Sequence, residues 1–283
     1  MQNYKMTLAY DGSRYQGWQG QGNTSNTIQA KVETALSRLT GSAVTIHASG
    51  RTDAGVHAGG QVVSFQLEQP LPCDKLLVDL NRWLPEDMGV MALEFAPPRF
   101  HARLSATGKQ YVYRIWNSPL PDVFGRKYRY ALPQTLDLEA MRQAARILEG
   151  THDFRSFCGL TRFKKSTVRT VYSISVTREG EVVSLRFCGN GFLNRMVRIL
   201  AGTLAEVGLG VRQPEEMAGV LEAKDRSAAA GALPPRGLTL AAVFYGENLP
   251  ERVDTEQEID HRTLDSGKAH RFDGKVKKCP LSD

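Results

Sequence analysis

The sequence contains no apolar run that approaches the roughly 20 residues a membrane-spanning helix requires. Residues 1–6 also lack the apolar core that a secretory signal carries near its start. These two absences argue against an integral membrane protein and against an exported one. The sequence therefore predicts a cytoplasmic protein with no membrane contact.

Cysteine is scarce and scattered. The four cysteines are Cys73, Cys158, Cys188 and Cys279, and no two of them form a CxxC pair. Disulfide-stabilised domains and structural zinc sites need cysteines in close, regular spacing. The sequence therefore predicts neither a disulfide framework nor a metal site.

The chain is basic, with a formal net charge of +6 and a pI near 9.2. Lys and Arg side chains that neutralise phosphates supply most of the sequence-independent affinity for nucleic acids. A basic soluble protein without such a partner has the same composition. Charge alone therefore does not decide whether the protein has a polyanionic partner.

Apolar residues of the first half recur with two periods, one typical of strands and one typical of helices. Ile28, Val32, Ala35 and Leu36 lie at helical spacing. Strands are predicted over 4–10, 43–49, 61–67 and 90–95, and helices over 27–39 and 73–84. The predicted order is βαββαβ.

The second half repeats this order. Strands are predicted over 110–117, 168–177, 182–188 and 238–245, and helices over 138–148 and 192–207, with a short extra helix over 214–223. The sequence thus predicts an α+β protein of two tandem ferredoxin-like (βαββαβ) halves, residues 1–98 and 99–246, with a catalytic cleft where they meet. Residues 247–283 are charged and poor in apolar side chains, which predicts a disordered polar tail.

The segment GRTDAGVH, at residues 50–57, follows an apolar strand, where a loop can present side chains from a rigid scaffold. Arg51 and Asp53 are two residues apart and project the same way in an extended chain. Asp53 is a candidate nucleophile or base, and Arg51 a candidate partner of a phosphate or carboxylate. The spacing fits equally well an Asp that stabilises a turn.

Two further positions carry side chains that suit either chemistry or packing. The ring of Tyr111, in a predicted strand, suits base stacking or the core, and Tyr113 shares its face. Arg195 and Arg198 lie side by side on the wheel of the predicted helix 192–207. Either arginine could pair with a carboxylate, or both could lie in solvent.

Several ordered blocks resemble the tRNA pseudouridine synthase A family, over about residues 4–246. The blocks are DGSRYQGWQ at 11–19, TIQ at 27–29, GRTDAGVHAGGQVVSF at 50–65, FHARLSATGKQYVYRI at 100–115, HDFRSF at 152–157, FLNRMVRILAGTLAEVG at 192–208 and AKDRSAAAGALPPRGL at 223–238. The chain departs from the family pattern at Lys109 and Gln110, where basic pairs are common, at Thr239, where an aromatic residue is usual, and in its added tail.

The resemblance implies a role for each candidate residue. It makes Asp53 the catalytic nucleophile and Arg198 the basic residue that pairs with it. Tyr111 would stack on the target base, and Arg51 would fill the space that the base leaves when it flips out of the helix.

The resemblance also implies an isomerase that converts uridine to pseudouridine at positions 38, 39 and 40 of the tRNA anticodon stem-loop. It implies a homodimer and no cofactor. Two alternatives are a non-catalytic RNA-binding protein, because ferredoxin-like sheets also stack on single-stranded RNA, and a hydrolase that releases free uracil.

Overall fold

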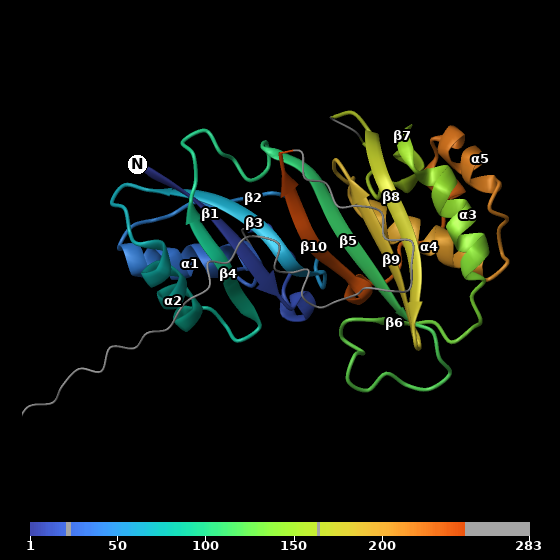
Figure 1. The fold of residues 1–283 in the computed structure, drawn as a ribbon, viewed down its shortest axis with the longest axis horizontal. Helices are drawn as coiled ribbons and strands as arrows, with labels where there is room; N and C mark the ends of the chain where they lie inside the picture. Colours follow the sequence, from blue (N-terminus) through green and yellow to red (C-terminus); the bar gives the residue numbers. More distant parts are fainter. Residues whose placement is uncertain (21–23, 163–164, 247–283) are drawn as a thin grey trace, which may run out of the picture.

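The computed structural model describes residues 1–20, 24–162 and 165–246. In that part of the chain, ten strands form one sheet that spans the molecule (Figure 1). The strands are β1 (Gln2–Tyr10), β2 (His47–Ala48), β3 (His57–Leu67), β4 (Met88–Phe95), β5 (Ala106–Trp116), β6 (Tyr130–Ala131), β7 (Gly150–Asp153), β8 (Val168–Glu179), β9 (Val182–Gly189) and β10 (Leu238–Tyr245). The predicted tail at 247–283 lies outside the described residues.

The main path through the sheet runs β4-β1-β3-β10-β5-β9-β8-β7, with β2 paired to β3 and β6 to β5. Neighbouring strands are antiparallel except in the β3–β10 and β5–β6 pairs. The predicted α+β class with a mostly antiparallel sheet is therefore confirmed. Pro97 and Pro98 lie in the connection from β4 to β5, between the two predicted halves.

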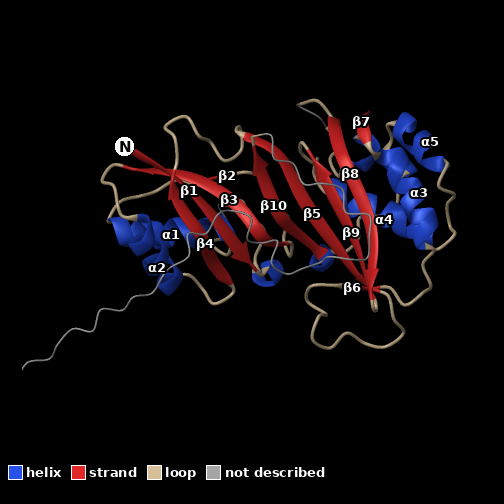
Figure 2. Cartoon of the chain, viewed as in Figure 1, coloured by secondary structure: helices blue, strands red, loops and turns tan. Residues whose placement is uncertain are grey.

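Helices lie at both ends of the sheet (Figure 2). They are α1 (Ile28–Thr40), α2 (Cys73–Trp83), α3 (Leu138–Leu148), α4 (Met196–Gly208) and α5 (Glu216–Ala223). Helix α2 packs on β4, α3 on β8 and on α4 and α5, and α4 also contacts β5. None of the described helices is long and apolar enough to cross a membrane.

Side chains cap the first turns of α1 and α3. The Thr27 hydroxyl accepts a hydrogen bond from the Ala30 amide at 3.3 Å, and α1 ends at Gly41 in the left-handed conformation, φ 71°. Asp137 accepts from the amides of Glu139 and Ala140, both at 3.0 Å, at the start of α3. These caps satisfy amides and carbonyls that a helix end leaves unpaired.

Two predicted strands differ most in length from those observed. The strand predicted over 43–49 pairs with β3 only at His47–Ala48, because the Ile46 amide donates to Glu33 and the Val44 amide to Ser37, both on α1. Strand β3 begins earlier than the predicted Gln61. Gly59 and Gly60 have low strand propensity, so the sequence pattern did not indicate that the strand already begins at His57.

Two other parts of the prediction are wrong. Helix α4 begins at Met196 rather than Phe192, because Arg195 has a left-handed φ of 57° and the Asn194 carbonyl accepts from the Gly159 amide. The short strands β6 and β7 were not predicted at all. Each pairs along only one edge, over two and four residues, which is too short for a clear period.

The pairing of β3 with β10 joins the N-terminal strands to the C-terminal ones. The two strands run parallel through Thr239 opposite His57 and Leu240 opposite Ala58. A Cβ added to Gly60 would lie 2.5 Å from the Ala241 carbonyl oxygen, whereas one added to Gly59 would meet nothing within 4 Å. The close backbone approach at this junction therefore requires Gly60.

We predict that Gly60→Ala destabilises the fold by about 1–3 kcal/mol, because the added methyl group forces the β10 backbone away from β3. The neighbouring substitution Gly59→Ala is the matched control and should leave stability within about 0.5 kcal/mol. Urea unfolding of both variants measures this. Equal stability of the two would show that the junction tolerates separation.

Candidate active site

The loop that carries Asp53 joins β2 to β3 and is held at its start by a buried glutamine. Gln61 accepts a hydrogen bond from the Ser49 hydroxyl at 2.7 Å and donates to the Gly50 carbonyl at 2.8 Å. The Val56 amide donates to the Asp53 carbonyl at 3.2 Å and closes a turn, with Gly55 at φ 78°. Asp53 thus sits in a fixed turn just before β3.

The loop that carries Gly17 and Trp18 packs against this turn. The Trp18 amide donates to the Thr52 carbonyl at 3.0 Å, and the Thr52 hydroxyl shares a hydrogen bond of 2.9 Å with buried Tyr10. Gly17 has a φ of 83°, and a Cβ there would lie 2.9 Å from the Thr52 oxygen and 3.0 Å from the Ala54 nitrogen. The GRTDAGVH and DGSRYQGWQ segments are therefore packed backbone against backbone.

Arg198 of α4 forms an ion pair with the Asp53 carboxylate, although the two residues are 145 positions apart in the sequence. Its Nη1 lies 3.2 Å from Asp53 Oδ2, and the two side chains are 13% and 31% exposed, respectively. Arg198 Nε donates to the Leu233 carbonyl at 2.6 Å, and the Leu233 amide donates back to the Arg198 carbonyl at 3.1 Å. The guanidinium is thus oriented on both sides, and one edge faces the carboxylate.

Tyr111 on β5 completes the group. Its ring is 8% exposed and meets Phe192 edge to face, with centroids 5.4 Å apart. Burial raises the pKa of the Tyr111 hydroxyl, and the nearby Tyr10 and Asp53 raise it further. The phenol therefore stays protonated at neutral pH. The structure thus places Tyr111 within electrostatic range of Asp53, the partner of Arg198.

Tyr113, two residues along β5, differs from Tyr111 in its contacts. Its ring is fully buried, and its hydroxyl donates to the Pro234 carbonyl at 2.8 Å. A Cβ on Gly237 would lie 2.7 Å from this ring, so the loop before β10 packs tightly on it. These contacts indicate a structural role for Tyr113.

Comparison with known families matches residues 6–103 and 144–246 to the family described as tRNA pseudouridine synthase. The chain belongs to this family. A "tRNA pseudouridine synthase A" of Bacillus sp. (strain KSM-64) is 43% identical over 245 residues, 87% of this chain and 100% of its own length. The protein of the same name from Brevibacillus brevis (strain 47) is 44% identical, with the same two coverages. The one from Geobacillus sp. (strain WCH70) is 44% identical over 242 residues, 85% and 97% of the two chains.

Family membership makes the chain an isomerase and rules out the non-catalytic alternative. A chain of a solved Cbf5–Nop10–Gar1 complex aligns over 72% of the enzyme at 16% identity, with a TM-score of 0.33, which is too low for any conclusion about this chain. Among the residues that the structure describes, no three His, Cys, Asp or Glu side chains are grouped so that they could hold a metal ion.

The two remaining arginines of the sequence analysis lie apart from the ion pair. Arg51 is exposed on the same loop as Asp53. Arg195 lies just before α4 rather than within it, and its exposed side chain forms no ion pair with Asp53. Of the two arginines that the helical wheel left open, the structure therefore pairs Arg198 with the carboxylate.

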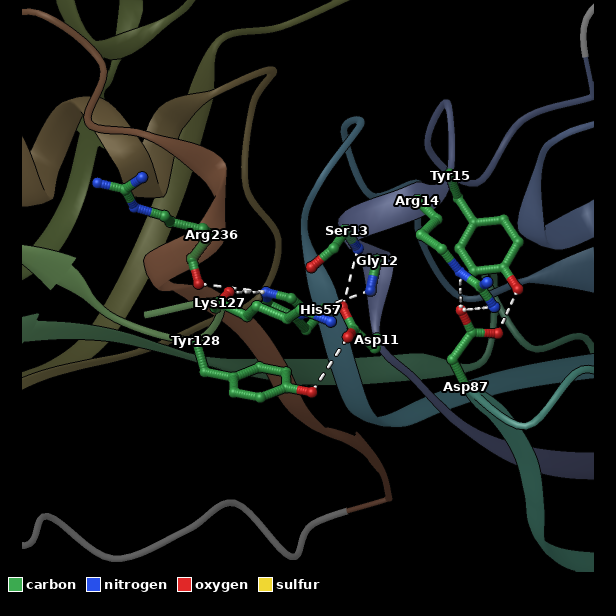
Figure 3. Close-up of polar contacts among 10 residues, drawn as sticks. All are labelled: Asp11, Gly12, Ser13, Arg14, Tyr15, His57, Asp87, Lys127, Tyr128 and Arg236. Carbon is green, nitrogen blue, oxygen red and sulfur yellow. Dashed lines mark hydrogen bonds and ion pairs between the residues drawn. The ribbon is translucent and has the colours of Figure 1, made fainter. Parts of the chain in front are cut away.

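His57, which the sequence analysis did not name as a site residue, joins three segments at the end of the Asp53 loop (Figure 3). Its ring is 3% exposed. Nδ1 accepts from the Gly12 amide at 3.1 Å, and Nε2 lies 3.0 Å from the Lys127 carbonyl and 3.2 Å from the Arg236 carbonyl. An amide can only donate and a carbonyl can only accept, so these contacts assign a neutral ring with its proton on Nε2.

Asp11 lies beside this ring and is held by its own partners. Its Oδ1 is 3.2 Å from His57 Nδ1, and its Oδ2 accepts from the Tyr128 hydroxyl at 3.1 Å. Burial lowers the pKa of His57, and the Asp11 charge opposes that shift only in part. In the sequence, His57 is a single histidine at the start of an apolar strand, and a histidine at such a position is equally typical of the core. The sequence therefore did not mark His57 as a site residue.

We predict that the enzyme loses stability as the pH falls below about 6.5, the ordinary pKa of histidine. The folded-state pKa is lower than that value, so His57 favours folding above 6.5, and its contribution is lost as the pH falls toward the folded pKa. The loss amounts to up to about 1.4 kcal/mol per pH unit between the two values. Urea unfolding from pH 5 to 7.5 measures it.

The variant His57→Gln should be less stable than wild type at pH 7.5 by about 1–3 kcal/mol, since buried carbonyls and an amide lose their partner. This gap should narrow at pH 5. The control His47→Gln replaces an exposed histidine and should keep the wild-type dependence. A gap that stays constant with pH would contradict the neutral assignment.

Proposed function

We propose that the enzyme isomerises uridine to pseudouridine at positions 38, 39 and 40 of the tRNA anticodon stem-loop, with Asp53 as nucleophile and without a cofactor. The observation that carries this proposal is the Asp53 carboxylate held by Arg198 beside Tyr111. The family and its curated relatives support the reaction on tRNA.

The reaction needs a carboxylate because it passes through an electron-poor sugar or base. The N1–C1′ glycosidic bond breaks, the uracil turns, C5 bonds to C1′, and the proton on C5 leaves while N1 gains one. No oxidation or reduction occurs. Asp53 acts by bonding to C1′, by adding to C6 of uracil, or by removing a ribose proton to form a glycal. These three routes share the requirement for an ionised Asp53.

The neighbouring residues each have a task in this scheme. Arg198 orients the Asp53 carboxylate, because its Nη1 donates to Oδ2 while its Nε is held by Leu233. The protonated Tyr111 offers its ring to the target uracil. Arg51, exposed at the edge of the loop, enters the space that the flipped nucleotide leaves.

The fold proposed with this function is a pair of tandem ferredoxin-like halves. The strand order supports it. The first half runs β4-β1-β3-β2, and the second runs β10-β5-β9-β8. If β6 and β7 are left out and the strands of each half are numbered along the chain, both halves have the order 4-1-3-2. The halves would meet at the β3–β10 pair, beside the Asp53 loop. A homodimer and a cytoplasmic location belong to the same proposal.

We predict that Asp53→Asn lowers the rate of pseudouridine formation by about 10³-fold or more, because the amide keeps the shape of the side chain and loses its nucleophilicity. Affinity for unmodified tRNA should stay within about twofold. Release of the C5 proton from uracil, mapped to nucleotide positions, measures the reaction. Undiminished turnover in the variant would refute the role of Asp53, and free uracil from wild type would point to the hydrolase alternative.

We predict that Arg198→Lys lowers kcat by about 10- to 100-fold while KM changes little, since one ammonium cannot reach both the Leu233 carbonyl and Asp53. The control Arg195→Lys keeps charge and position next to α4 and should retain wild-type kcat. Thermal unfolding of both variants shows whether the fold is intact. Equal kcat in the two would mean that the orientation of Arg198 is unimportant.

A further inference from the structure

Three basic side chains interact electrostatically at the start of the Asp53 loop, where Lys109 contacts Ser49. They are Lys109 on β5, Arg169 on β8 and Arg103 in the connection between β4 and β5, and we call them the Lys109 cluster. Among the described residues, no carboxylate lies within ion-pair distance of any of the three. Charged side chains are rarely buried without a partner of opposite charge. The positive charge of this cluster therefore has no acidic partner in the described part of the chain.

Lys109 is built into the site rather than loose on the surface. It is half-buried, and it precedes Tyr111 by two residues on the same face of β5. Its Nζ donates to the Ser49 carbonyl at 2.7 Å, at the start of the Asp53 loop. A Cβ on Gly50 would lie 2.8 Å from Nζ, so the glycine makes room for the ammonium group.

The ammonium group retains donors for a ligand. An ammonium has three N–H bonds, and the Ser49 carbonyl takes one of them. Arg169 directs Nη1 to the carbonyls of Ser166 and Val168, at 2.9 and 2.6 Å, which fixes its position. Its Nε and Nη2 have no hydrogen bond among the described residues. Arg103 is exposed.

The electrostatics of the Lys109 cluster favour the binding of an anion. Burial, together with the charges of Arg103 and Arg169, lowers the pKa of Lys109 to about 8. Burial also lowers the pKa of Arg169. A protein gains nothing in stability from three cations that repel one another in a half-buried place, whereas an anion bound there would be strongly attracted.

We propose that the Lys109 cluster binds a phosphodiester of the RNA backbone adjacent to the nucleotide that enters the Asp53 site. The proposal rests on the RNA substrate proposed above. A phosphodiester has the single negative charge and the free oxygens that one ammonium and two guanidinium groups can bind together. Lys109 would then fix the strand beside Tyr111 while its contact to Ser49 ties that strand to the Asp53 loop.

Binding of an unmodified tRNA transcript as a function of salt tests the proposal. In an Asp53→Asn background, which prevents turnover, Lys109→Gln should raise Kd about five- to tenfold near 0.1 M salt and reduce the slope of log Kd against log salt by about 0.7–0.9. Lys75→Gln removes the same charge from the exposed face of α2 and should change neither quantity. Because binding is read directly, the result is independent of whether the enzyme forms pseudouridine.

The pH dependence of binding separates an anion contact from a purely structural one. From pH 7 to 9 the Kd of the Asp53→Asn protein should rise as free Lys109 loses its proton, while Lys109→Arg should bind equally well across this range. The charged groups that face Lys109 are Arg103 and Arg169, and burial holds the neighbouring Tyr111 phenol protonated over this range.

Two results would overturn the proposal. The first is a Lys109→Gln protein with unchanged Kd and salt slope, even if its kcat falls, because Lys109 would then only position the Asp53 loop. The second is a Lys109→Arg protein that shows the same rise of Kd with pH as the parent. A normal thermal melt of each variant excludes misfolding as the cause of weakened binding.

Discussion

The ion pair between Asp53 and Arg198 is the interaction on which the proposed chemistry depends. A partly exposed carboxylate keeps one orientation only if a donor is fixed opposite it. Arg198 provides such a donor because α4 packs on β5 and because Leu233 holds the guanidinium from its other side. The pair thus links a loop of the first half of the chain to a helix of the second.

Several close backbone contacts keep the carboxylate in that place. Gly17 allows one loop to lie directly behind Thr52, and Gly60 allows β10 to lie directly beside β3. His57 adds a polar link, since a single neutral ring joins the ends of three segments that are distant in sequence. Small residues and one histidine therefore set the position of a group that none of them touches.

Much of this arrangement could be predicted from the sequence. Long elements with a clear period, such as α1 and β5, were found because burial on one face leaves a regular apolar pattern. The residues alone made Asp53, Tyr111 and Arg198 candidates, and only the family resemblance assigned a role to each, since each residue alone also fits an ordinary turn, core or surface position. The structure adds that the three lie together, which no local pattern contains.

Other features could not be predicted, for identifiable reasons. The segment 43–46 reads as a strand, but its amides bond to side chains of α1, and that competition is invisible in a period. Arg195 adopts a left-handed backbone that its residue type does not favour, so the start of α4 was misplaced. The role of His57 depends on carbonyls 70 and 179 positions away, which only the tertiary structure reveals.

The place of β10 in the sheet has a consequence for biosynthesis. This strand is the last one of the described chain, yet it lies in the middle of the sheet, between β3 and β5. A nascent chain still lacking residues 238–245 leaves an edge of each half unpaired, and such edges invite association with other chains. Pairing of the two halves therefore requires residues 238–245, which are translated after every other strand of the described chain.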